Sequence, residues 1–270
     1  MPYAAANGIR LYYERHGSGS PLVLICGFTM TVEGWPRDRQ PYAAHYEVVS
    51  FDNRGAGRSD APSGDYTTAQ MADDVVALLD VLGIDRTHVF GASMGGHIAL
   101  ELALRHPQRI SGLVLAMTAD HVSTKQQHLL RVWQDLREHG LPEELLIREQ
   151  LHWLQRPSFF ENPRAVEAWV QGALSSPLQT REGYAGQTAA CIHHDTREQV
   201  HRITAPTLVI AAEQDQIIPC SSSREMAARI PGAELVLIPD AAHVLTPRQY
   251  RDFDQTVLGF LKRCPPDGAR

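Results

Sequence analysis

The chain has 270 residues, of which 43% are hydrophobic and 21% charged, a composition typical of a globular protein with one large core or a core and an insertion. Its net charge of −6 gives no electrostatic footprint for nucleic acid, and it has no run of about 18 apolar residues that could span a bilayer, so neither is expected as a partner. Met1 to Gly8 show no secretory signal, which makes the cytoplasm the default location, and the four scattered cysteines fit neither a metal site nor a disulfide framework.

The first part of the chain alternates predicted strands and helices. Asn7-Gly8 is a two-residue hairpin signal before the partly alternating stretch 9–14, so the chain is predicted to open with an antiparallel hairpin. The apolar runs 21–26 and 46–51 are typical of strands buried on both faces of a sheet, and a short helix could lie between them, within 35–45. Apolar residues at helical spacing predict a helix over 67–82.

The same alternation continues through the middle of the chain. Residues 87–90 have the β-branched and aromatic character of a buried strand, and the helix formers that follow end before Pro107. Another strand is predicted over 110–117. Strands and helices in this order indicate a parallel α/β sheet with right-handed crossovers.

The alternation stops after Thr118. The stretch 121–201 is poor in strands and carries four helix-like segments, which are 126–138, 142–155, 163–173 and 179–192. They are predicted to form a small helical layer that lies over the rest. The sheet then resumes with strands at 207–210 and 234–238, helices near 222–230 and 248–261, and a loose tail at 265–270.

Between the strand at 87–90 and its helix lies Gly91-Ala92-Ser93-Met94-Gly95. Strand, sharp turn and helix are the context in which G-x-S-x-G forms a nucleophile elbow. A serine hydroxyl is a poor nucleophile at neutral pH, so it must stand where a base can take its proton and a backbone N–H can meet the oxyanion. Met94 would supply one such N–H from the first turn of the helix. The alternative is a glycine-rich turn whose serine only caps the helix.

Three segments together resemble the α/β-hydrolase family, in particular its capped esterases and enol-lactonases. They are the elbow around Ser93, the stretch 51–60, which is similar to the family's D-x-R-G-x-G-x-S loop, and the stretch 203–215, which is similar to the strand before the family's acidic residue. The resemblance covers nearly the whole chain and implies a mostly parallel eight-stranded sheet with helices on both faces. It implies a core domain at 1–119 and 202–270 and a helical cap at 120–201, inserted after the sixth strand.

In this fold the nucleophile, the acid and the histidine follow one another along the chain, each beyond the carboxyl end of a strand. Asp215 and His243 stand at such positions, so with Ser93 they are the predicted catalytic triad, and Asp120 is the alternative acid. The run 193–195, His-His-Asp, looks like metal ligands but lacks further ligands at useful spacing. We expect it to be an exposed helix end or a cap contact, and we expect no metal.

The loop after the strand at 21–26 departs from the family pattern. It reads Cys26-Gly27-Phe28 where the family usually has His-Gly. The resemblance implies the N–H of Phe28 as the second oxyanion donor, and a backbone donor need not be lost with the histidine. Cys26 could line the pocket or be a small buried hydrophobe, and we favour the second. The other candidate pocket residues are Trp133, Trp153 and Val244.

These residues predict hydrolysis of a carboxylic ester or lactone of a small, partly apolar substrate through an acyl-Ser93 intermediate. No cofactor is expected, because the protein itself supplies nucleophile, base and oxyanion donors. A carbon–carbon bond hydrolase, a lyase or a perhydrolase could use the same triad, and a ligand-binding member of the fold without catalysis is a further alternative. A monomer or a homodimer is expected.

Overall fold

The computed structural model describes residues 2–33, 39–175 and 179–264. The predicted helix within 35–45 lies partly outside these residues, and the predicted tail at 265–270 lies wholly outside them.

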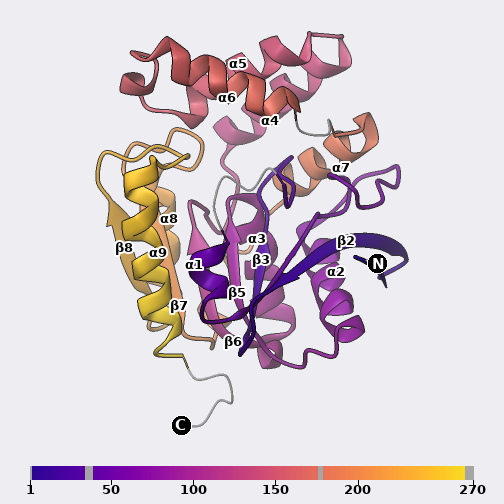
Figure 1. Ribbon diagram of the computed structural model, residues 1–270, viewed down its shortest axis with the longest axis vertical. Helices are drawn as coiled ribbons and strands as arrows, with labels where there is room; N and C mark the ends of the chain where they lie inside the picture. The colour runs from indigo at the N-terminus through magenta and orange to yellow at the C-terminus, as the bar shows by residue number, and fades with distance from the viewer. Residues whose placement is uncertain (1, 34–38, 176–178, 265–270) are drawn as a thin grey trace.

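The described residues form an eight-stranded sheet with the order β1-β2-β4-β3-β5-β6-β7-β8. Its strands are β1 (Tyr3–Ala6), β2 (Ile9–His16), β3 (Pro21–Ile25), β4 (Glu47–Phe51), β5 (Thr87–Ala92), β6 (Ile110–Ala116), β7 (Thr207–Ala212) and β8 (Glu234–Ile238). β2 pairs antiparallel with both β1 and β4, and all later pairs are parallel (Figure 1). The predicted fold is therefore confirmed.

The opening hairpin forms because Asn7 and Gly8 both adopt positive φ, 48° and 80°, as a two-residue turn between twisted strands requires.

The helices follow the predicted segments closely. They are α1 (Gln40–Ala43), α2 (Thr68–Val81), α3 (Met94–Arg105), α4 (Thr124–Glu138), α5 (Glu143–Leu154), α6 (Pro163–Ser175), α7 (Arg181–Ile192), α8 (Cys220–Arg229) and α9 (Pro247–Leu261). Capping boxes fix two of the starts, with Ser123 and Gln126 at α4 and Thr246 and Gln249 at α9. Within the described residues, no helix is both long and apolar enough to cross a membrane.

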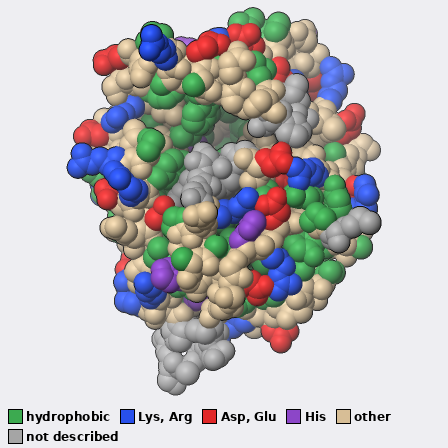
Figure 2. Space-filling view, in the orientation of Figure 1, with side chains coloured by type: hydrophobic (Ala, Val, Ile, Leu, Met, Phe, Trp, Pro, Cys, Tyr) green, Lys and Arg blue, Asp and Glu red, His purple; other side chains and the backbone are tan. Residues whose placement is uncertain are grey.

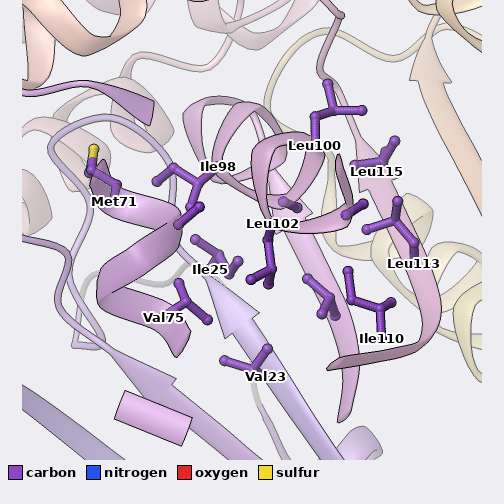
Figure 3. Close-up of a cluster of buried hydrophobic side chains, with 14 of the residues drawn as sticks. Val23, Ile25, Met71, Val75, Ile98, Leu100, Leu102, Ile110, Leu113 and Leu115 are labelled. Carbon is purple, nitrogen blue, oxygen red and sulfur yellow. The ribbon is translucent and has the colours of Figure 1, made fainter. Parts of the chain in front are cut away.

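Two buried clusters cover the two faces of the sheet. Residues of α2, α3 and α8 pack with the strands on one face, and residues of α1 and α9 pack on the other. Figure 3 shows the first cluster, in which Ile25 of β3 lies between Val75 of α2 and Leu102 of α3, and Val23 lies below them along the same strand. Both faces of the central strands are thus buried, as their continuous apolar sequence requires.

Helices α4 to α7 occupy the chain between β6 and β7, and α4, α5 and α6 lie above the sheet in Figure 1. Leu129, Trp133 and Leu146 form a small core of their own between α4 and α5. The end of α7 differs, because Ala190 and Cys191 belong to the buried cluster of the sheet. The helical layer is therefore anchored to the core through α7.

Candidate active site

Ser93 stands on a strained turn between β5 and α3. Its φ of 54° and ψ of −122° are a conformation that residues with a side chain seldom adopt. The turn is held on both sides, because the N–H of Ser93 donates to the carbonyl of Ala116 at 3.0 Å and Thr118 Oγ1 donates to the carbonyl of Ser93 at 2.9 Å. The side chain is only partly buried, as a nucleophile requires.

The glycines around Ser93 are needed for close backbone approach. A Cβ on Gly91 would lie 2.2 Å from the carbonyl oxygen of Gly95, and a Cβ on Gly95 would lie 2.0 Å from the carbonyl oxygen of Ile25. Any side chain at either position would force the turn apart. The glycine spacing of the motif is thus a packing requirement of the strand–turn–helix unit.

His243 and Asp215 complete a line of hydrogen bonds with Ser93. The ring of His243 is 3.1 Å from Ser93 Oγ through Nε2 and 2.7 Å from Asp215 Oδ2 through Nδ1. Because a carboxylate oxygen accepts, Nδ1–H donates to Asp215 and Nε2 is left to accept from the serine. The other oxygen, Asp215 Oδ1, accepts the N–H groups of Ile217 and Ile218, each at 2.8 Å. The carboxylate is 1% exposed and fixed at both oxygens.

The loop after β3 lies directly beside the serine. A Cβ on Gly27 would stand 3.4 Å from Ser93 Cβ. The N–H of Thr29 donates to Gln187 Oε1 at 3.0 Å, whereas among the described residues the N–H of Phe28 has no acceptor. The N–H of Met94 lies in the first turn of α3, where a helix provides no acceptor. Both predicted oxyanion donors are thus available on the walls of the site.

A cavity of about 350 Å³ opens at Ser93 and His243. Its lining is mostly apolar. The lining residues come from the β3 loop, from β5 and α3, from α4 to α7, from the loops after β6, β7 and β8, and from α9. Figure 2 shows a hollow beneath the helices at the top of the view, with hydrophobic side chains on its wall. Such a volume is at the small end of ligand pockets, of about 300 to 1,000 Å³.

Comparison with known proteins agrees with this geometry. The family model described as alpha/beta hydrolase fold matches residues 20–246. The chain belongs to the α/β-hydrolase family.

Three relatives show how far the likeness reaches. A protein of Azorhizobium caulinodans named as a carbamate hydrolase is 29% identical, over 96% of this chain and 98% of its own. The 3-oxoadipate enol-lactonase 2 of Acinetobacter baylyi is 31% identical, over 96% of this chain and 95% of its own. The crystal structure of the enol-lactonase from Burkholderia xenovorans superposes with a TM-score of 0.86 at 29% identity, covering 97% of this chain and 100% of that one. This α/β hydrolase is thus similar to hydrolases along its whole length.

The predicted pocket residues fall into two groups in this α/β hydrolase. Trp133 and Val244 line the cavity. Cys26 and Trp153 do not, which corrects their place among the candidates. Cys26 is 0% exposed and packs in the cluster of the α1 and α9 face, where burial raises the pKa of its thiol well above the usual range. Trp153 packs against the small core between α4 and α5 and donates to Glu149 Oε1 at 3.0 Å.

The alternative acid, Asp120, is engaged elsewhere. It is 0% exposed, and its two oxygens meet Arg229 Nη1 at 2.7 Å and His121 Nδ1 at 2.9 Å. Among the described carboxylates, Asp215 alone accepts a hydrogen bond from His243.

The histidine run after α7 agrees only in part with the exposed helix end or cap contact that we expected. His193 is exposed and caps the carboxyl end of α7. His194, in contrast, is 3% exposed and stacks on His97 with 4.3 Å between ring centroids. Burial is the main cause that lowers the pKa of His97 to about 3, and burial also holds the pKa of His194 well below its usual value, so both rings are neutral. Across residues 2–33, 39–175 and 179–264, no group of three ligand-type side chains could hold a metal ion.

Sequence reasoning missed the side chains that hold the β3 loop. Asn53 Nδ2 donates to the carbonyl of Cys26 at 2.9 Å, and Gln187 bridges Thr29 and Arg54. Asn53 lies inside the recognised stretch 51–60, so its position could have suggested a role. A glutamine on a helix of the 121–201 insertion carried no such signal.

Proposed function

We propose that this α/β hydrolase cleaves a carboxylic ester or lactone through an acyl-Ser93 intermediate. The observation that carries the proposal is the line of hydrogen bonds from Ser93 Oγ through His243 to Asp215, 3.1 and 2.7 Å long, at the edge of a mostly apolar cavity. The names of the lactonase and carbamate hydrolase relatives agree with attack on an acyl carbon that bears a heteroatom.

The geometry suits each step of acyl transfer. Ser93 Oγ attacks the carbonyl carbon while His243 Nε2 takes its proton, and Asp215 stabilises the resulting imidazolium. The N–H groups of Phe28 and Met94 stabilise the negative oxygen of the tetrahedral intermediate. The bond to the leaving oxygen then breaks, and His243 protonates that oxygen. Water repeats the sequence on the acyl-enzyme, and Ser93 is regenerated.

The cavity favours a small and partly apolar substrate. Its lining combines apolar side chains such as Leu129 and Trp133 with a few polar ones, among them Gln126 and Arg137. We further propose that residues 120–201 act as a cap domain over the core at 1–119 and 202–270, because helices of this insertion supply one wall of the cavity. Substrate choice would then depend on the cap.

The test compares the hydrolysis rates of wild type and Ser93→Ala. The substrates are p-nitrophenyl acetate, butyrate and octanoate, and an aliphatic γ-lactone whose hydrolysis is measured by the acid that it releases. We expect turnover in the wild type, loss of at least about 10³-fold in Ser93→Ala, and labelling of Ser93 by a fluorophosphonate. Circular dichroism and melting temperature control for folding. Equal activity in both proteins, or a wild type that neither turns over nor takes the label, refutes the proposal. In the second case, a vinylogous β-diketone tests for carbon–carbon hydrolysis.

A further inference from the structure

Gln187 of α7 links the loop after β3 to the loop after β4, beside the candidate site. It is 0% exposed, and both ends of its amide are used. Oε1 accepts the N–H of Thr29 at 3.0 Å, and Nε2 donates to the carbonyl of Arg54 at 2.9 Å. One buried side chain therefore joins the loop after β3 to the loop after β4, from a helix of the insertion.

Thr29 has a backbone that needs to be held. Its φ is 61°, a left-handed conformation in which a β-branched residue is a genuine outlier. Such a residue persists only where its surroundings fix it. Two hydrogen bonds hold this part of the loop. The N–H of Met30 donates to the carbonyl of Gly27 at 3.3 Å and closes a turn around Phe28 and Thr29, and the N–H of Thr29 donates to Gln187, which ties that turn to α7.

Phe28 lies between two fixed points. Upstream, the carbonyl of Cys26 accepts from Asn53 at 2.9 Å, and downstream, the N–H of Thr29 donates to Gln187. The Phe28 ring also meets the Tyr184 ring of α7 edge to face, with 5.0 Å between centroids. The direction of the Phe28 N–H thus depends on α7 as well as on the loop after β4.

We propose that Gln187 is a positioning residue that aims the N–H of Phe28 at the oxyanion. The proposal rests on the acyl-transfer function proposed above. Gln187 does not line the cavity and acts through the Thr29 peptide. Through Gln187, helix α7 of the insertion sets the direction of one of the two oxyanion donors. This support comes in a chain that has Cys26 at the position of the family's usual histidine. Gln187 therefore affects the stabilisation of the transition state and leaves substrate binding largely unchanged.

The first experiment compares Gln187→Leu with Thr188→Val on a p-nitrophenyl ester. Thr188 is the next residue of α7, is also 0% exposed, and has a hydroxyl without a hydrogen-bond partner among the described residues, so valine preserves its shape. Losing a whole oxyanion donor costs about 10² to 10³ in kcat. We expect a misaimed donor to lower kcat by about 10- to 100-fold, with KM changed less than about threefold. Thr188→Val should stay within about twofold of wild type.

A second variant separates positioning from packing. In Gln187→Glu, a protonated carboxyl can accept from Thr29 and donate to the carbonyl of Arg54, whereas an ionised carboxylate can only accept and repels that carbonyl. The ratio of kcat in Gln187→Glu to kcat in wild type should therefore be near one at low pH and fall as pH rises. A role in helix packing alone would leave this ratio independent of pH.

Hydrogen exchange of a peptide that covers residues 26–31 follows the loop without reference to activity. We expect faster exchange there in Gln187→Leu than in wild type or Thr188→Val. Unchanged kcat in Gln187→Leu, a loss expressed only in KM, or unchanged exchange at 26–31 overturns the proposal. A wild type without Ser93-dependent turnover refutes the proposed function instead, and faster exchange at 26–31 then shows that Gln187 still clamps the loop.

Discussion

Replacing Asp215 by asparagine should abolish the base function of His243 without disturbing the site's shape. Asp215 Oδ1 accepts two N–H groups, from Ile217 and Ile218, both at 2.8 Å. These donors will hold the oxygen of the new amide on their side, so its NH₂ group must take the place of Oδ2 and face His243 Nδ1. Two donors cannot share that contact, and the imidazole will carry its proton on Nε2. It then has no lone pair for the Ser93 proton.

The expected loss is large because the wrong tautomer removes the base entirely. In a serine hydrolase triad this change lowers kcat by about 10⁴-fold, which corresponds to about 5 kcal/mol of activation free energy. The measurement is the hydrolysis rate of p-nitrophenyl butyrate under saturating substrate, with the melting temperature measured in parallel. We expect little change in melting temperature, since both bonds to Oδ1 are kept.

Asp120→Asn is the matched control for this experiment. Asp120 is also buried and follows a neighbouring strand, but its partners are Arg229 and His121. The loss of its charge should lower stability while leaving turnover of the folded protein within about threefold of wild type. If Asp120→Asn were the inactive variant, or if Asp215→Asn lost less than about tenfold, the assignment of the acid would be wrong.

Two further predictions concern stability. Gly95→Ala places a Cβ 2.0 Å from the carbonyl oxygen of Ile25. Such overpacking should lower the free energy of unfolding by about 2 kcal/mol or more, seen as a lower melting temperature and lost activity. In the control Gly259→Ala, the new Cβ has no atom within 4 Å, so the melting temperature should stay unchanged or rise. Burial lowers the pKa of His88 from 6.5 to about 4, so the unfolded chain binds the proton first. His88 alone should therefore lower the free energy of unfolding by roughly 3 kcal/mol between pH 6.5 and 4, and the buried His97 and His194 act in the same direction. Urea unfolding at pH 7 and pH 5 measures this slope, and equal midpoints would contradict it.

The strands and turns that carry the site could be predicted because short stretches of the sequence determine each of them. The apolar runs of β3 to β7 predicted buried strands, and the run of β8 predicted a strand that proves to be a partly exposed edge of the sheet. The order of Ser93, Asp215 and His243 along the chain follows from the order of these strands. The structure brings these three side chains within hydrogen-bond distance. Even the helices of the insertion fall within a few residues of their predicted bounds.

Side-chain direction within the insertion was not predictable in the same way. Trp133 and Trp153 lie on successive helices and look alike in sequence, yet one lines the cavity and the other does not. Both rings contact the small core between α4 and α5, Trp133 as a buried member and Trp153 as a partly buried neighbour. Which of them reaches the cavity therefore depends on tertiary packing. The stacking of His194 on His97 likewise joins the end of α7 to α3, across nearly a hundred residues.

The residues that shape the site share a feature that sequence patterns do not reveal. Three residues other than glycine adopt positive φ at the carboxyl ends of neighbouring central strands, namely Thr29 after β3, Ser93 after β5 and Met117 after β6. All three line the cavity. Only around Ser93 do glycines in the sequence indicate the strained backbone, because close backbone approach there forbids a side chain. At Thr29 and Met117 the strain is imposed by contacts with other parts of the fold. Contacts such as the hydrogen bond from Thr29 to Gln187 impose this strain. Through them, the function of this α/β hydrolase depends on residues far away in the chain.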